Sequence, residues 1–163
     1  MKKLNRKGFT LVELLAVIII LAIVVGITIP AVLTTTNNAR KKAFDTAAQS
    51  AADWFDRQYQ VLITGLNGTG IATLDANFTT VCGNDASSCT ATTGTDLTEV
   101  GLAAAGLKAS NFSTTSGDNK VYINANGRSC IKLKAASSGG DYPNGTVTCG
   151  GSCTTTQCTS TNN

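Results

Sequence analysis

Residues 14–33 read LLAVIIILAIVVGITIPAVL, a stretch without a charged side chain. Twenty residues of α-helix rise about 30 Å, which matches the thickness of the hydrocarbon core of a bilayer. Four basic residues precede the stretch: Lys2, Lys3, Arg6 and Lys7. Because basic residues favour the cytoplasmic side of a membrane, the pattern predicts one membrane span, with residues 1–8 inside and the rest of the chain outside.

An ordinary secretory signal fits this segment less well. The hydrophobic stretch of a secretory signal is about 7–15 residues long and is followed by a cleavage site of small residues. The stretch here is longer, and no convincing site of that kind follows it. In addition, Glu13 lies at the cytoplasmic edge of the apolar run, where a carboxylate needs a partner or a functional reason.

The residues around Glu13 read KGFTLVELL, over positions 7–15. This string resembles the class III leader of prepilins in the type IV pilin and pseudopilin family. The resemblance implies that prepilin peptidase cuts between Gly8 and Phe9 and then methylates the new amine of Phe9. A residue without a Cβ suits the cut because a protease can approach its backbone closely. The resemblance also makes Glu13 the docking glutamate, which faces the N-terminal amine of a neighbouring subunit in the filament. A plain membrane anchor is the alternative.

Beyond residue 37 the pattern becomes amphipathic. Apolar side chains recur every fourth position and neighbouring ones widen the stripe: Ala43, Ala47, Ala51, Phe55 and Tyr59, with Ala48, Ala52 and Leu62. We therefore expect a helical spine over residues 9–64 that packs on a sheet through its alanines and ends near Gly65. Residues 9–33 form its transmembrane or filament-core part. Pro30 predicts a helix break there, because proline removes one backbone donor.

Residues 65–163 are rich in Gly, Asn, Thr and Ser and predict a small head. The clearest strands are residues 120–124 and 129–134, joined by a turn that contains Asn126-Gly127. A third strand is expected near residues 145–149, and residues 97–107 suit a short helix. The fold class is therefore α+β, with a long N-terminal helix and a small antiparallel head. The resemblance implies the same pilin-like form.

All six cysteines lie in the head, at Cys82, Cys89, Cys130, Cys149, Cys153 and Cys158. An even number in such a region indicates disulfides and an oxidising compartment. The first two bracket a turn and predict a local bond. The other four allow three pairings, of which we favour Cys130–Cys149 between two strands and Cys153–Cys158 in the tail. A zinc site is the alternative, although the spacing lacks two paired C-x-x-C motifs.

The chain contains no histidine, which removes the commonest general base and metal ligand. We predict no catalytic residues, cofactor or metal site, and no enzyme activity. Without residues 1–8 the chain has nine basic and ten acidic residues, so it lacks the positive balance of a nucleic-acid-binding protein.

The resemblance implies a structural subunit of a type IV pilus. Its expected partners are further subunits in a homopolymer or mixed filament, prepilin peptidase, an assembly platform in the inner membrane, and the membrane before assembly. The precursor is expected in the cytoplasmic membrane and the product in an extracellular filament. Two alternatives stay open. One is a pseudopilin of a type II secretion or competence DNA-uptake system, and the other is a membrane-anchored binding protein that never polymerises.

Overall fold

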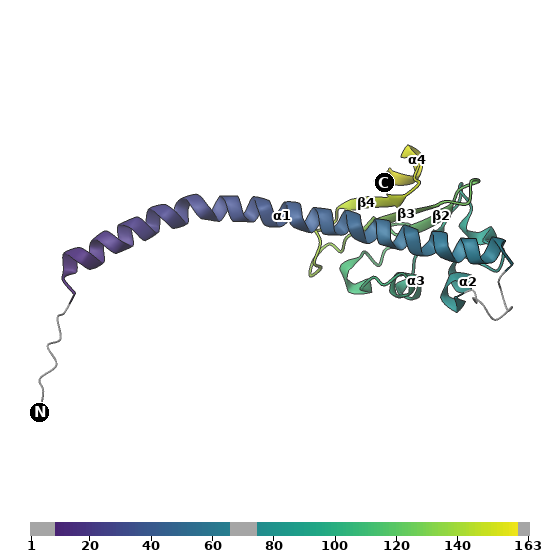
Figure 1. Ribbon diagram of the computed structural model, residues 1–163, viewed down its shortest axis with the longest axis horizontal. Helices are drawn as coiled ribbons and strands as arrows, with labels where there is room; N and C mark the ends of the chain where they lie inside the picture. The colour runs from purple at the N-terminus through teal and green to yellow at the C-terminus, as the bar shows by residue number, and fades with distance from the viewer. Residues whose placement is uncertain (1–8, 66–74, 160–163) are drawn as a thin grey trace, which may run out of the picture. The chain divides into compact units, whose positions relative to one another are not determined.

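The structure, a computed structural model, describes residues 9–65 and 75–159. They form two compact units, one ending at Ala39 and the other beginning at Arg40. The longest element, helix α1 (Leu11–Ile63), contributes to both units (Figure 1). The second unit therefore contains the C-terminal part of the predicted spine together with the head.

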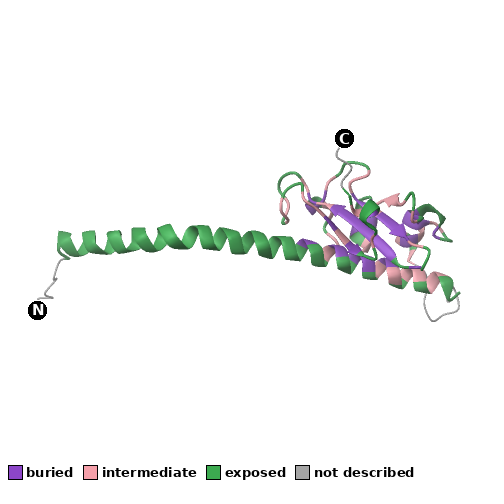
Figure 2. Ribbon diagram, turned by 90° about the horizontal axis from the view of Figure 1, so that it is seen from above, coloured by how far each residue is buried: buried purple, intermediate pink, exposed green. Residues whose placement is uncertain are grey.

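The first unit is the apolar part of α1. Its large side chains are exposed all round the helix, and Figure 2 shows this part uniformly in the colour of exposed residues. Within the described part of the chain, α1 is the one helix long and apolar enough to cross a bilayer. A helix that is apolar on every side needs lipid or other helices around it, because water solvates it poorly.

The helix break predicted at Pro30 is wrong for this structure, in which Pro30 lies inside the continuous helix α1. Proline cannot make the backbone bond to the carbonyl of Gly26, but the bonds of neighbouring residues suffice to hold the helix. Nearby hydroxyls also bond the backbone. Thr28 Oγ1 donates to the carbonyl of Val24 at 3.0 Å, and Thr34 Oγ1 donates to that of Pro30 at 3.0 Å.

The second unit is a small α+β head, as predicted. Its helices and strands are α2 (Ala76–Cys82), β1 (Thr95–Asp96), α3 (Glu99–Ala104), β2 (Lys120–Ile123), β3 (Ser129–Lys134), β4 (Val147–Gly151) and α4 (Thr155–Cys158). Two short 3₁₀ turns, Ser87–Cys89 and Ala109–Asn111, complete the described part of the head. The four strands form one antiparallel sheet in the order β1-β2-β3-β4.

The predicted hairpin joins β2 to β3. Ile123 pairs with Ser129, so five residues connect the strands instead of a tight two-residue turn. Gly127 adopts a φ of 73°, and its amide donates to the carbonyl of Asn124 at 2.8 Å. The ring of Tyr59 on α1 lies against Gly127, where a Cβ would meet it at 2.7 Å. Glycine is therefore needed both for the turn and for its contact with α1.

The alanines of α1 bring its backbone against the edge strand β4. Ala48, Ala51 and Ala52 are fully buried. A Cβ added to Gly150 would lie 2.1 Å from the carbonyl oxygen of Ala48, far inside van der Waals contact. Small residues on both elements therefore set the distance between helix and sheet. The stripe differs from the prediction at its start, where Phe44 is buried and Ala43 is exposed.

Polar side chains of α1 beside the alanine stripe form bonds with the sheet. The hydroxyl of Ser129 donates to the carbonyl of Ala52 at 2.7 Å, and its amide donates to Asp56 at 2.6 Å. Asp45 accepts from the Thr148 hydroxyl at 2.5 Å. The amide of Gly151 donates a hydrogen bond to Gln49 at 3.0 Å, and Arg128 forms an ion pair with Asp56 at 3.1 Å. This row flanks the alanine face and fixes the position of α1 on the sheet.

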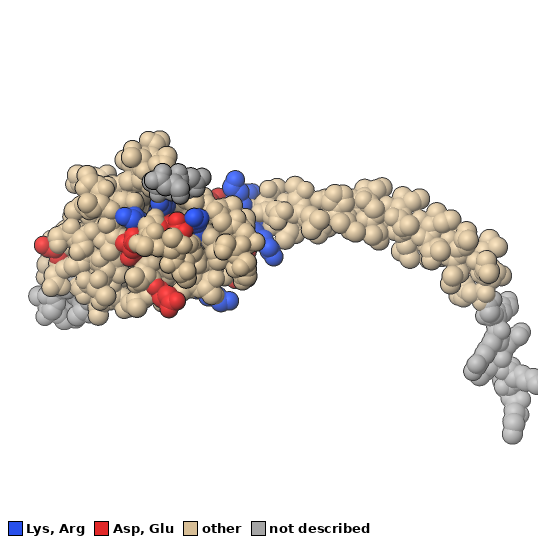
Figure 3. Space-filling model, turned by 180° about the vertical axis from the view of Figure 1, so that it is seen from behind, with Lys and Arg blue, Asp and Glu red and all other residues tan. Residues whose placement is uncertain are grey.

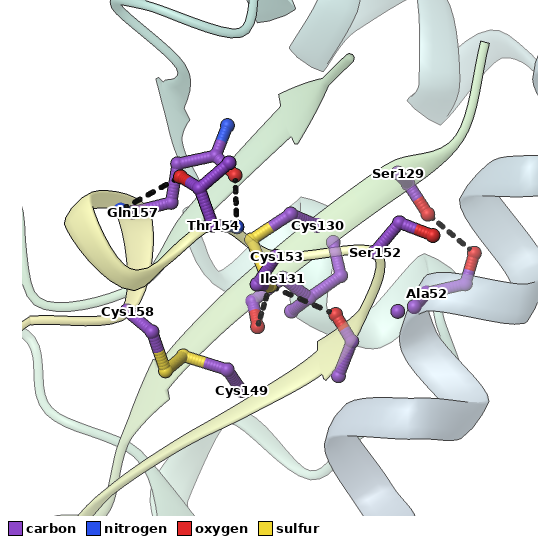
Figure 4. The surroundings of a disulfide bond; sticks show 12 residues. Ala52, Ser129, Cys130, Ile131, Cys149, Ser152, Cys153, Thr154, Gln157 and Cys158 are labelled. Carbon is purple, nitrogen blue, oxygen red and sulfur yellow. Dashed lines mark hydrogen bonds between the residues drawn. A yellow bond between two sulfur atoms is a disulfide. The ribbon is translucent and has the colours of Figure 1, made fainter. Parts of the chain in front are cut away.

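Three disulfides staple the head. The predicted Cys82–Cys89 bond is present, whereas the predicted Cys130–Cys149 and Cys153–Cys158 bonds are wrong. The bonds formed are Cys130–Cys153 and Cys149–Cys158 (Figure 4). All six cysteines are thereby paired, which leaves no thiolates for the zinc alternative.

The strand register explains the difference. Cys130 lies opposite Gly151, and Cys149 lies opposite Lys132, so the two cysteines are not cross-strand partners. Gly151 has a φ of 79°, which turns the chain out of β4. The turn brings Cys153 over β3, and α4 then returns Cys158 to β4 (Figure 4).

The Gly150→Ala variant tests the close contact between α1 and β4. The added methyl group has no space beside Ala48, so we expect the free energy of unfolding to fall by about 3 kcal/mol. The single tryptophan, Trp54, packs edge-on against Phe55 and reports on this core in urea titrations of the detergent-solubilised chain. Gly140→Ala is the control, since its nearest contact would be 3.3 Å. Equal unfolding midpoints for the two variants would contradict the packing argument.

Thiol counting in double variants tests the disulfide pairing. Replacing Cys130 and Cys153 by serine removes one complete bond, so the unfolded protein should show no free thiol. Replacing Cys130 and Cys149 breaks two bonds and should expose two thiols, or a new non-native bond between their former partners. The first variant should also lose about 3 kcal/mol of stability through its larger unfolded ensemble. The opposite thiol counts would restore the pairing expected from the sequence.

Candidate functional site at the start of the apolar helix

The predicted processing site lies at the beginning of the described chain. Gly8, and with it the bond between Gly8 and Phe9, falls outside the described residues. Phe9 itself is 85% exposed and precedes the first turn of α1. The residue that is expected to carry the new amine is therefore accessible and directly adjoins the helix.

Thr10 and Glu13 form a reciprocal cap on the first turn of α1. The Glu13 carboxylate accepts from the amide of Thr10 at 2.9 Å and from its hydroxyl at 2.8 Å. In return, the Thr10 hydroxyl accepts from the amide of Glu13 at 3.3 Å. This arrangement is a capping box, which satisfies backbone donors that lack partners within the helix.

The cap gives Glu13 a definite place before any neighbour is present. A carboxylate in the first turn also interacts favourably with the positive end of the helix dipole. The Glu13 carboxylate accepts from the amide of Thr10. Cleavage between Gly8 and Phe9 would create a positive amine on Phe9, the residue directly before Thr10. The arrangement can thus hold a negative charge close to the new N-terminus.

Thr10 is the residue that the sequence interpretation missed. The signal was available, because Thr-x-x-Glu before an apolar run is the pattern of a capping box. The remaining predicted residues do not join this site. Pro30 lies farther along α1, and the six cysteines form the staples of the head.

A surface cavity of about 320 Å³ lies in the head beside β1, α3 and residues 113–119. Asp96 is a carboxylate that lines this cavity. It accepts hydrogen bonds from the Ser116 hydroxyl and from the amide of Gly117, the latter at 3.0 Å. Asp96 also lies 3.7 Å from the ammonium group of Lys120. Its contacts tie the loop to the sheet.

Asp118 ties the other end of the same loop. Burial raises the pKa of its carboxyl group, but hydrogen bonds from Ser113 and Lys134, with the positive charge of Lys134, outweigh burial and hold the pKa below its usual value.

In the described part of the chain, no three Cys, Asp or Glu side chains come together in a way that could hold a metal ion.

Comparison with known families identifies the N-terminal segment. Residues 3–29 match the family described as the prokaryotic N-terminal methylation motif. Comparisons with curated proteins and with solved structures gave no match. The matched segment contains Gly8, Phe9, Thr10 and Glu13. Together with the apolar helix and the antiparallel head, the motif supports a precursor of the type IV pilin and pseudopilin kind.

Proposed function

We propose that this chain is a structural subunit of a type IV pilus, cleaved after Gly8 and methylated on Phe9 by prepilin peptidase. The observation that carries the proposal is the methylation motif at residues 3–29, whose described part leads into helix α1 with apolar side chains exposed on every side. Such a helix is suited first to the membrane and then to a bundle of identical helices. On this proposal the chain acts by assembly and is no enzyme.

The head supports a pilus over the pseudopilin alternative. Three disulfides close loops around a small core and a sheet of four short strands. Disulfides suit a protein that functions outside the cell, where the environment is oxidising and a small core gives limited stability. The proposed path leads from a single-pass precursor in the cytoplasmic membrane, through the assembly platform, to an extracellular filament of further subunits.

Glu13 is proposed to select the axial position of an incoming subunit. In the surroundings of apolar helices, a carboxylate is strongly favoured beside a positive amine over standing alone. Its own cap with Thr10 holds the carboxylate at the start of the helix. The amine on Phe9 of a neighbouring subunit is then its partner in the filament.

Mass spectrometry of the protein recovered from cells tests the processing step. We expect a mass that lacks residues 1–8, carries one added methyl group on Phe9 and lacks six hydrogens because of three disulfides. Electron microscopy of the same cells should show surface filaments that contain the chain. An intact N-terminus would support a membrane-anchored binding protein, and processed protein without surface filaments would support a pseudopilin.

Two substitutions separate the charge of Glu13 from its role in the cap. Glu13→Gln keeps an acceptor at the capping position but removes the charge, so we expect normal cleavage and loss of filaments. Thr10→Val removes the hydroxyl but keeps the charge. It should weaken the first turn by about 1 kcal/mol and still permit assembly. Filament counts and cleavage are measured for both. Normal filaments from Glu13→Gln would show that docking does not depend on charge.

A further inference from the structure

The proposed function does not use a cluster of three consecutive basic residues on α1. This basic cluster consists of Arg40, Lys41 and Lys42, and all three side chains are exposed. They are the first charged residues after Glu13. Figure 3 shows an uncharged surface along the apolar part of α1 and blue side chains where the charged part of the chain begins.

We propose that the basic cluster binds the headgroups of anionic phospholipids at the outer face of the membrane. The inference rests on the membrane-anchored precursor and its orientation in the proposed function. It adds a lipid partner and a second anchoring device to that function.

Distance along the chain supports this partner. Arg40 is seven residues beyond Leu33, the last residue of the apolar run, which corresponds to a helical rise of about 10 Å. The polar layer on each side of a bilayer is roughly 5–7 Å thick. Side chains on a helix lean towards its N-terminus, and long basic side chains extend several ångströms. The charged groups of the cluster can therefore reach back into the headgroup layer.

The spacer between the apolar run and the cluster suits the same layer. Thr34, Thr35 and Thr36 each donate a hydroxyl hydrogen bond to a backbone carbonyl four residues earlier, at 2.9–3.0 Å. Their polar groups are thus satisfied within the helix and carry no charge. The transition from hydrocarbon to charged groups is consequently gradual, as it is at a membrane surface.

The protein itself offers the cluster little counter-charge. The ion pairs within the described residues involve Lys120, Arg128 and Lys134 instead. Asp45 is the acidic residue nearest to the cluster along α1, and its carboxylate accepts the hydroxyl of Thr148 at 2.5 Å. Anionic headgroups would supply partners for three basic side chains that form no ion pair within the described residues.

Cleavage changes the balance of charge across the span. The precursor has Lys2, Lys3, Arg6 and Lys7 before the apolar run and the basic cluster as the first charged residues after it. Removal of residues 1–8 takes away all four of the former. The basic cluster then becomes the principal cationic contact with the membrane. The main electrostatic attraction between the mature subunit and anionic lipids is therefore at the outer leaflet.

Lipid selectivity of the full chain in vesicles tests the proposal. The chain is reconstituted into phosphatidylcholine vesicles that contain spin-labelled phosphatidylglycerol or spin-labelled phosphatidylcholine. Electron spin resonance then gives the preference for the anionic lipid. We compare the natural sequence with one variant carrying Arg40→Gln, Lys41→Gln and Lys42→Gln. The matched control carries Gln at the four basic leader positions, and an Arg40→Lys variant preserves charge.

We expect the cluster variant to lose at least roughly fivefold in preference for phosphatidylglycerol, since one basic residue at an anionic surface contributes about that factor. The leader control and Arg40→Lys should keep a clear preference, and high salt should weaken it. A preference as strong as that of the natural sequence in the cluster variant would overturn the proposal. Retained preference combined with lost filaments in cells would assign the cluster to a neighbouring subunit instead.

Extraction with alkaline carbonate separates this inference from the proposed function. Protein that washes out of the vesicles would overturn the membrane anchor, and with it the basis of both proposals. Protein that stays inserted but shows no lipid preference would overturn the lipid contact alone. The fluorescence of Trp54 confirms in each variant that the head is folded, because this residue packs in the core far along the chain from the substitutions.

Discussion

The contact between the backbone of α1 and strand β4 is the constraint on which the head depends. Ala48 and Gly150 leave no room for even one methyl group between them, so the two elements meet at the closest distance that backbone atoms allow. Interiors are packed densely, and a contact of this kind tolerates little adjustment. The aromatic side chains then fill the space on either side, with Phe44 against Tyr142 and Phe55 against Phe78.

One helix serves two environments because its composition changes along its length. The apolar part has large aliphatic side chains on every side and lacks charge between Glu13 and Arg40. The part within the head has alanines on one face and a flanking row of polar side chains that bond the sheet. The first pattern is suited to lipid or to equivalent helices, and the second is specific for this sheet.

The sequence was sufficient to predict the elements whose signal is local. The long helix with its apolar part, the hairpin and the strand at residues 129–134 follow from hydropathy, periodicity and an Asn-Gly turn. The disulfide partners required the register between β3 and β4, which depends on contacts distant in sequence. The roles of Asp45, Gln49 and Asp56 were hidden for the same reason, since a polar residue beside an apolar stripe usually faces water.

At the candidate site, the sequence pointed to Glu13 but not to its partner Thr10. Glu13 was recognised as an unusual charge, whereas its bond with Thr10 depends on the conformation of the first turn. The short helices α2 and α4 were also missed. They contain only seven and four residues, too few for a periodic pattern to stand out.

The overlapping order of the two C-terminal disulfides has a consequence for resistance to proteolysis. Cys149 lies between Cys130 and Cys153, and Cys158 lies beyond both. A single peptide-bond cut anywhere from residue 130 to residue 158 therefore leaves the two fragments covalently joined. Sequential pairing would instead let one cut between Cys149 and Cys153 release the tail. The crossed connection makes the end of the chain tolerant of a protease nick that would otherwise shed it.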